Sequence, residues 1–372
     1  MSVPSFIESP FTTRVAYEKW LALPEDQRAA ALAKAATKSA APLASTPVPK
    51  SGGLLAESNF FALEGGAPLL RRNNKYLGPE GLPAGLRERL DAWPALCGAA
   101  ANEGVNGSLC NDEAALRIFL RDAERTFQDE GHRNRMMELL KCVWPENKDY
   151  HQGLGYVTSL LMLFFDGETV VQMLLRLSRD EKYTPGYWKA APEAYVRDAM
   201  VYQRLLEERV PKAAALLQQA CVVPEAYASK WFIGLCVHVL PFEALLRFVE
   251  HFLEEGFVYL FKFSVACVQA IEPRLLECKF TDVNIILELL RLDTTQYPDD
   301  YDAKDGAPPG SFFTRLVADA KAVDLDAAQI TTMREEAWVV LQEKMRRTRE
   351  REAQMAEEES DDEIVFSDEE DD

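Results

Sequence analysis

Apolar residues recur at intervals of three and four positions along most of the chain between about residues 80 and 295. Clear examples are the runs at 116–120, 136–143 and 245–252. This spacing gathers apolar side chains on one face of an α-helix, whereas a half-buried strand would alternate with a period of two. The sequence shows no sustained alternation bounded by hairpin turns and no repeat of fixed length. The pattern therefore predicts an all-α protein with an irregular set of helices, and not a repeat solenoid.

Prolines divide this helical pattern into segments. Proline fits the first turn of a helix but breaks its interior, because it lacks the N–H group that an interior position donates. Helices are therefore expected to begin or end at five positions: Pro192, Pro211, Pro224, Pro241 and Pro273.

Composition divides the chain into four parts. Residues 1–55 combine short helical stretches with a linker rich in Pro, Gly and Ala, and this N-terminal segment is expected to be flexible. Residues 78–295 form the predicted multi-helix domain. Residues 296–352 hold a loop and a charged helix, which is expected to run from about Ala327 to Arg351. Residues 353–372 form an acidic tail that is predicted to be disordered.

Much of the net negative charge comes from this tail. The formal charge is −19, and residues 357–372 carry eleven acidic side chains and no basic one, so that subtracting 11 from 19 leaves −8 for the rest. No basic face dominates the remainder, which argues against nucleic acid as a partner. Ser360 and Ser367 each precede an acidic run. A phosphorylation site of the acidophilic kind and a plain solvated tail are equally open there.

Several classes of site are missing from the sequence. The seven cysteines are an odd number without a C-x-x-C pair, which is typical of reduced thiols in a cytoplasmic protein. The four histidines show no metal-ligand spacing, and no phosphate-binding loop for GTP occurs. The N-terminus has no secretory h-region. The two most apolar stretches, Trp231–Val249 and Phe257–Ile271, contain charged residues and are predicted to be buried helices rather than membrane spans.

Four short motifs follow one another in the predicted domain. They are Arg89-x-x-x-Trp93-x-x-Leu96-x-Gly98, Asp122-x-x-Arg125-Thr126, Tyr150-x-Gln152-Gly153, and Tyr227-x-x-Lys230-Trp231-Phe232 with the later Leu253-Glu254-Glu255-Gly256. In this order and spacing they resemble the TBC domain family of Rab GTPase-activating proteins, over roughly 200 of the 372 residues. The chain departs from the family at Phe119, where Ile is usual, and at Val249-Glu250, where many members have Trp-Asp. An apolar exchange such as Phe for Ile is tolerated where the site repacks.

The resemblance implies that Arg125 and Gln152 are the catalytic residues. A guanidinium neutralises charge on a phosphoryl group in transfer, and a carboxamide orients the attacking water. Without the motifs, the simpler interpretations are a surface ion pair for Arg125 and a capping or buried amide for Gln152. Gly153 is expected to let the backbone approach the partner closely.

Supporting roles are expected for four other residues. Asp122 lies one helical turn before the arginine and is predicted to orient it or to bond a nearby backbone donor. Tyr150 is predicted to pack and to position the glutamine loop. Arg89 and Trp93, at i and i+4, are predicted to share a helix face and to brace the domain, with the arginine over an aromatic ring or paired with a carboxylate.

The resemblance also implies a function. The protein would stimulate GTP hydrolysis by a Rab-family small GTPase in its GTP-bound form, and so regulate vesicle trafficking. It would need no cofactor of its own, because GTP and Mg²⁺ are bound by the partner, and it would be cytoplasmic or peripheral at endomembranes through that partner. The alternative is a catalytically silent GTPase-binding module or a helical adaptor. The sequence names neither the GTPase nor the oligomeric state.

Overall fold

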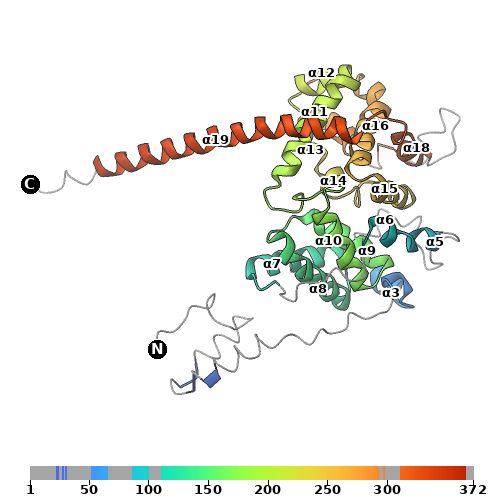
Figure 1. Ribbon diagram of the computed structural model, residues 1–372, viewed down its shortest axis with the longest axis vertical. Coiled ribbons are helices and arrows are strands. Elements are labelled where there is room, and N and C mark those ends of the chain that lie inside the picture. Colours follow the sequence, from blue (N-terminus) through green and yellow to red (C-terminus); the bar gives the residue numbers. More distant parts are fainter. Residues whose placement is uncertain are drawn as a thin grey trace, which may run out of the picture.

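The computed structural model describes residues 22–24, 27–28, 30–31, 52–65, 86–99, 110–292, 296–297 and 311–365. Helices are the only regular elements in these ranges, which confirms the predicted all-α class (Figure 1). The elements are η2 (Leu54–Ala56), α3 (Phe60–Glu64), α5 (Leu86–Asp91), α6 (Trp93–Cys97), α7 (Glu113–Thr126), α8 (Glu130–Asn147), α9 (Gln152–Phe164), α10 (Gly167–Arg179), α11 (Glu193–Arg209), α12 (Pro211–Gln219), α13 (Pro224–Tyr227), α14 (Ser229–Phe232), α15 (Phe242–Glu255), α16 (Phe257–Leu275), α17 (Val283–Leu290), α18 (Ser311–Ala320) and α19 (Ala327–Val365).

Local sequence signals set many of the helix starts. Asp112, Asp129 and Asp166 each precede a helix, and their carboxylates accept hydrogen bonds from backbone N–H groups in the first turns of α7, α8 and α10. Four of the five expected prolines stand at or just before a helix start. Pro273 does not, because it lies inside the last turns of α16.

The helices form two groups that follow the chain order. Helices α7, α8, α9 and α10 pack against one another at one end of the molecule, and α11, α12, α15, α16 and α18 pack together at the other (Figure 1). Twelve of the 19 residues of α16 are buried, and from Phe257 to Val268 only Val258 and Lys262 are half-buried, as expected of a helix at the centre of a core. Helix α6 contacts both α10 and α15 and so joins the two groups.

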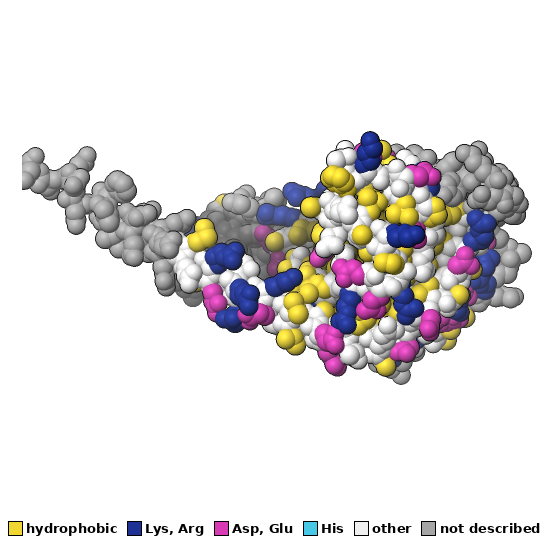
Figure 2. Space-filling model, turned by 90° about the horizontal axis from the view of Figure 1, so that it is seen from above, with side chains coloured by type: hydrophobic (Ala, Val, Ile, Leu, Met, Phe, Trp, Pro, Cys, Tyr) yellow, Lys and Arg dark blue, Asp and Glu magenta, His cyan; other side chains and the backbone are white. Residues whose placement is uncertain are grey.

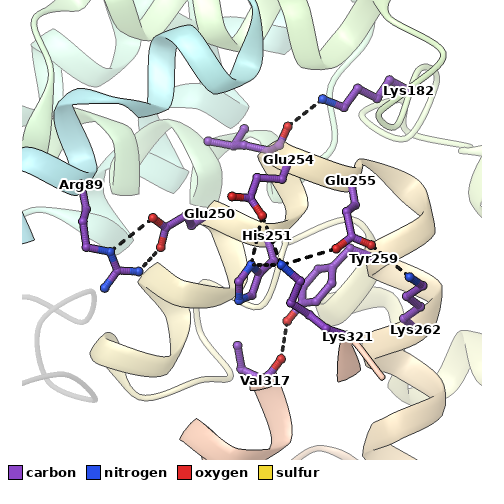
Figure 3. A network of polar contacts seen from close by, with 11 residues as sticks. Arg89, Lys182, Glu250, His251, Glu254, Glu255, Tyr259, Lys262, Val317 and Lys321 are labelled. Atoms are coloured by element: carbon purple, nitrogen blue, oxygen red, sulfur yellow. Dashed lines mark hydrogen bonds and ion pairs between the residues drawn. The ribbon is translucent and has the colours of Figure 1, made fainter. Parts of the chain in front are cut away.

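Polar contacts hold the ends of α15 and α18, and one of them crosses between the two groups (Figure 3). Lys182 Nζ, in the connection after α10, donates to the carbonyl oxygen of Leu253 at the end of α15 at 2.9 Å. Lys321, just beyond α18, lies 3.4 Å from Glu254 and 3.7 Å from Glu255. The hydroxyl of Tyr259 donates to the carbonyl oxygen of Val317 at 2.9 Å. These contacts fix the ends of α15 and α18 against the core.

Helix α19 is anchored at its start and then leaves the body of the protein (Figure 1). Arg334 is the anchor, since its Nε donates to the buried Asp198 of α11 at 2.9 Å and its guanidinium lies 3.9 Å from the ring centre of Phe257. The helix continues to Val365, beyond the end predicted near Arg351, and so occupies most of the segment predicted to be a disordered tail. Residues 352–358 explain the difference, because Glu, Ala, Gln and Met all have high helix propensity.

The region before the predicted domain also belongs to the fold. Residues 52–65 pack on it, with Leu54 and Phe60 fully buried, although residues up to 55 were expected to be linker. Leu54 is apolar and directly follows two glycines, so the linker composition ends at Gly53, where the chain enters the core. The other short helices and linker predicted within residues 1–55 lie mostly outside the described residues, as do Ser367 and residues 366–372.

The apolar stretches are buried, as predicted, but residues 233–241 of the first form turns between α14 and α15 instead of helix. Within the described ranges, no helix is both long enough and apolar enough to cross a membrane. The seven cysteines are free thiols, and four of them are buried. On the face shown in Figure 2, basic and acidic side chains are interspersed and do not gather into a patch of one sign.

Candidate functional site

The two predicted catalytic residues stand at helix ends. Arg125 is the second-last residue of α7, and Gln152 is the first residue of α9. Helix α7 buries one face of Phe119, Asp122, Ala123 and Thr126 and leaves the other face in solvent. The side chain of Arg125 is consequently 67% exposed and accessible to another protein.

The buried carboxylate of Asp122 brings these two residues together. Its Oδ1 accepts a hydrogen bond from Gln152 Nε2 at 3.2 Å and lies 3.6 Å from Arg125 Nη1. Its Oδ2 accepts from the hydroxyl of Tyr150 at 2.8 Å. Burial raises the pKa of Asp122, while the contacts with Tyr150, Arg125 and Gln152 oppose that rise. Asp122 was predicted to orient the arginine or to bond a backbone donor, and its contact with Gln152 was not foreseen.

Tyr150 occupies the packed position predicted for it. The residue is 6% exposed, and its ring meets that of Phe119 edge-on with 4.9 Å between the ring centres. Burial raises the pKa of Tyr150 far above its ordinary value, so the hydroxyl remains a donor to Asp122. The unusual Phe119 thus fills the space beside the tyrosine that holds Asp122.

The start of α9 is held by contacts within the chain. His151 Nδ1 accepts a hydrogen bond from the N–H of Gly153 at 3.0 Å, and burial lowers the pKa of His151, which keeps this nitrogen free to accept. A Cβ atom at Gly153 would lie 2.6 Å from both Cγ2 and the carbonyl oxygen of Ile233. The backbone of Ile233 therefore requires a glycine here, a reason that the sequence did not indicate, while the predicted approach of a partner stays a prediction.

Arg89 and Trp93 lie away from this site. They occupy two short helices, α5 and α6, instead of one helix face. The helix ends at Asp91, and the next one begins at Trp93 with Pro94 in its first turn. Both nitrogens of the Arg89 fork bind the carboxylate of Glu250 on α15, with Nε 3.2 Å from Oε1 (Figure 3). Trp93 is buried against Phe164 and Phe165, with ring centres 6.0 and 6.3 Å away. Of the two contacts predicted for Arg89, the carboxylate is the one that forms.

Sequence reasoning missed a buried cluster beside the turn that follows Arg125. Glu64 of α3 is fully buried, and its two carboxylate oxygens accept from the N–H groups of Gln128 and Asp129 at 2.7 and 2.9 Å. His132 of α8 lies between Glu64, 2.8 Å from Nδ1, and Glu57, 3.0 Å from Nε2. No motif marks these residues, although a glutamate in the apolar run Phe60-Phe61-Ala62-Leu63-Glu64 was a usable signal.

The His132 cluster predicts a pH dependence of stability. Burial opposes protonation of His132, but the hydrogen bonds to Glu64 and Glu57 outweigh it and raise the pKa of the imidazole. A raised pKa stabilises the fold below the unfolded value of about 6.5, and this contribution is lost as the pH rises through the folded value. Urea denaturation of wild type and His132→Gln should therefore give a stability difference that shrinks from about pH 6 upward.

His251 provides the control for this measurement. Burial lowers its pKa, so its contribution should be lost as the pH falls rather than as it rises. A wild-type advantage over His132→Gln that stayed constant with pH would contradict the assignment of charge to His132.

Three comparisons place the chain among known proteins. Residues 87–276, about half of the chain, match the family model described as the Rab-GTPase-TBC domain. Carabin from Mus musculus is 30% identical over 207 residues, which cover 51% of this chain and 46% of that protein. Growth hormone-regulated TBC protein 1 from Homo sapiens is 26% identical over 231 residues, covering 57% of this chain and 68% of that protein. The chain thus matches less than half the length of Carabin.

One solved structure aligns with the chain over a similar length. The crystal structure of the Chlamydomonas flagellar RabGAP TBC domain aligns with 66% of this chain and 88% of its own, at 18% identity and a TM-score of 0.48. The described residues that match the family model include Arg89, Asp122, Arg125, Tyr150 and Gln152.

Proposed function

The chain belongs to the Rab-GTPase-TBC domain family, and from this premise we propose that it accelerates GTP hydrolysis on a Rab-family small GTPase in the GTP-bound form, with Arg125 and Gln152 acting in trans. One observation supports the two residues as a pair. The buried carboxylate of Asp122 contacts both of them, although they stand on different helices. A surface ion pair alone would not account for an arginine and a glutamine that share one buried acceptor.

Arg125 has the chemistry to stabilise the transition state. Its guanidinium is permanently charged and offers two parallel N–H groups to phosphate oxygens. The 3.6 Å spacing to Asp122 is too long for a strong hydrogen bond, so the exposed fork stays free to bind a partner's nucleotide. Asp122 orients the Arg125 side chain but leaves its N–H groups available to other acceptors.

Gln152 has the chemistry to position water. Its Nε2 donates to Asp122, which leaves the amide oxygen as an acceptor for the O–H of an attacking water. Gln152 is held at the helix start by its two neighbours. His151 caps the helix, and Gly153 packs against Ile233. GTP and its Mg²⁺ come with the partner, so this chain supplies side chains and not a cofactor.

A Rab partner carries further proposals. Rab-family GTPases act on vesicle membranes, so the protein would regulate vesicle trafficking. It would work in the cytoplasm and reach endomembranes through the GTPase that it binds.

Single-turnover hydrolysis across a panel of GTP-loaded Rab proteins tests the proposed function. At least one Rab should be accelerated by wild type, and Gln152→Ala should lower that acceleration about a hundredfold, the cost of removing one positioned polar group. Gln172→Ala is a matched control, because Gln172 is a partly exposed glutamine on α10 that bonds to Glu168 on its own helix. No acceleration of any Rab would overturn the proposal.

A pull-down with nucleotide-locked GTPases identifies the alternative. Binding of a GTP-loaded Rab without acceleration would show a silent binding module instead of an activator. Acceleration that survives Gln152→Ala unchanged would leave an activator but reject the role of the glutamine.

A further inference from the structure

We propose that Glu64 is a positioning residue for Arg125, and that residues 53–64 form a brace between the two helices that carry the catalytic candidates. The proposal rests on the proposed function, because it concerns the geometry of the same arginine. The brace precedes residues 87–276, the part of the chain that matches the family model.

Glu64 lies in a pocket of hydrogen-bond donors. Its carboxylate is fully buried and has three donors: the N–H groups of Gln128 and Asp129 and the Nδ1 of His132. The two backbone donors lie just before α8, where the helix dipole favours a negative charge. A buried carboxylate with this set of donors is stable only while the set stays in place.

Neighbouring charged and aromatic side chains hold the His132 cluster in place. Both ring nitrogens of His132 face carboxylates, and only an imidazolium donates from both. Arg135 Nη1 donates to the other oxygen of Glu57 at 3.0 Å. Asp129 accepts from the N–H of His132 at 3.1 Å, and Phe60 packs against the imidazole. Positive and negative groups thus alternate from Arg135 to Glu64.

A short stretch of fixed backbone connects Glu64 to Arg125. Only Thr126 and Phe127 separate Arg125 from Gln128, the first residue whose N–H binds Glu64. Both are fixed, since Thr126 Oγ1 donates to the carbonyl oxygen of Asp122 at 2.7 Å and Arg133 Nε donates to that of Phe127 at 2.7 Å. Phe127 is 1% exposed. A displacement of Gln128 is therefore passed on to the last turn of α7.

The other end of the brace is attached to α9. The N–H of Gly53 donates to the carbonyl oxygen of Phe164, the last residue of α9, at 3.3 Å. A Cβ atom at Gly53 would lie 2.3 Å from the backbone of Phe164, so only glycine permits this approach. Leu54 is fully buried and η2 packs on α9. One short segment therefore joins the helix that begins with Gln152 to the turn beside Arg125.

Glu64→Gln tests the proposal in the full-length chain. The amide is nearly the same size, but its NH2 group faces donors, so the turn loses at least one bond. We expect the kcat of stimulated hydrolysis to fall about tenfold to a hundredfold, the range for a catalytic group misplaced by about 1 Å, with the KM for the GTP-loaded GTPase unchanged. If Glu64→Gln does not fold, Glu64→Asp is used in its place, because it keeps the charge and loses only one methylene. Glu138→Gln, on the exposed side of α8, is the control.

The Arg125→Ala background separates positioning from general damage. If Glu64 acts through Arg125, Glu64→Gln should lower the kcat of wild type but leave the residual kcat of Arg125→Ala unchanged. An equal loss in both backgrounds, an unchanged wild-type kcat, or an effect on KM alone would overturn the proposal.

Amide hydrogen exchange gives a measurement that needs no GTPase. Glu64→Gln should speed exchange at the amides of residues 126–129 and leave those of α10 unchanged. Unchanged exchange at Gln128 and Asp129 would reject the brace even if the protein is an activator. Faster exchange in a protein that accelerates no Rab would retain the brace as structure, remove its proposed role in positioning Arg125, and reject the proposed function.

Discussion

The variant Arg125→Lys is expected to lower the kcat of stimulated GTP hydrolysis by about a thousandfold, since an arginine supplied to a GTPase is worth about 10³–10⁵ in rate. Lysine keeps the positive charge but loses the planar fork that binds two phosphate oxygens at once. The fold should tolerate the change, because the arginine side chain is 67% exposed and its ion pair with Asp122 spans 3.6 Å. Single-turnover hydrolysis at saturating protein measures the effect.

Arg117→Lys is the matched control for this experiment. Arg117 lies two turns earlier on the exposed face of α7 and pairs with Glu113 at 3.6 Å. The same change of chemistry there should leave kcat within about twofold of wild type, as expected of a surface substitution. Full acceleration by the Arg125→Lys variant would show that a point charge suffices and that no bidentate contact forms.

Gly256→Ala is expected to destabilise the fold by about 3 kcal/mol or more, because it combines backbone strain with a steric clash. Gly256 joins α15 to α16 with φ 66° and ψ −141°, a region that only glycine enters easily. A Cβ atom there would lie 1.8 Å from the carbonyl oxygen of Lys182. That oxygen also accepts a hydrogen bond from the N–H of Phe257 at 2.8 Å, so it cannot move away without losing a partner. Urea denaturation measures the loss.

Gly98→Ala separates the two causes. Gly98 also has a positive φ, 69°, but the atom nearest to its added Cβ would be 3.6 Å away. Only the left-handed backbone conformation then opposes alanine, at about 1 kcal/mol. If both variants lost the same stability, the contact between Gly256 and Lys182 would not be as tight as the structure shows.

The catalytic candidates were readable from the sequence because their signals are local. Asp122 and Arg125 are one turn apart on one helix, and Gln152 and Gly153 begin the next helix but one, so short motifs contain them. The helical periodicity likewise comes from neighbouring residues.

The rest of the site depends on contacts between distant residues. Glu64 binds groups 64, 65 and 68 positions away, and no periodicity within α3 indicates such partners. The contact between Gly153 and Ile233 was not indicated, because Ile233 comes from a later part of the chain. Even the local prediction for Arg89 and Trp93 was incomplete, since Pro94 divides their segment into two helices.

The projecting helix α19 has a mechanical consequence. About 24 residues lie between Leu341, the last buried position among the helix side chains described up to Met355, and the helix end at Val365, which corresponds to roughly 36 Å at 1.5 Å per residue. An arm of that length amplifies small movements at its base, so that a tilt of about 10° at Leu341 would displace its far end by roughly 6 Å. A fluorophore attached near Val365 would therefore act as a pointer to the orientation of the whole domain.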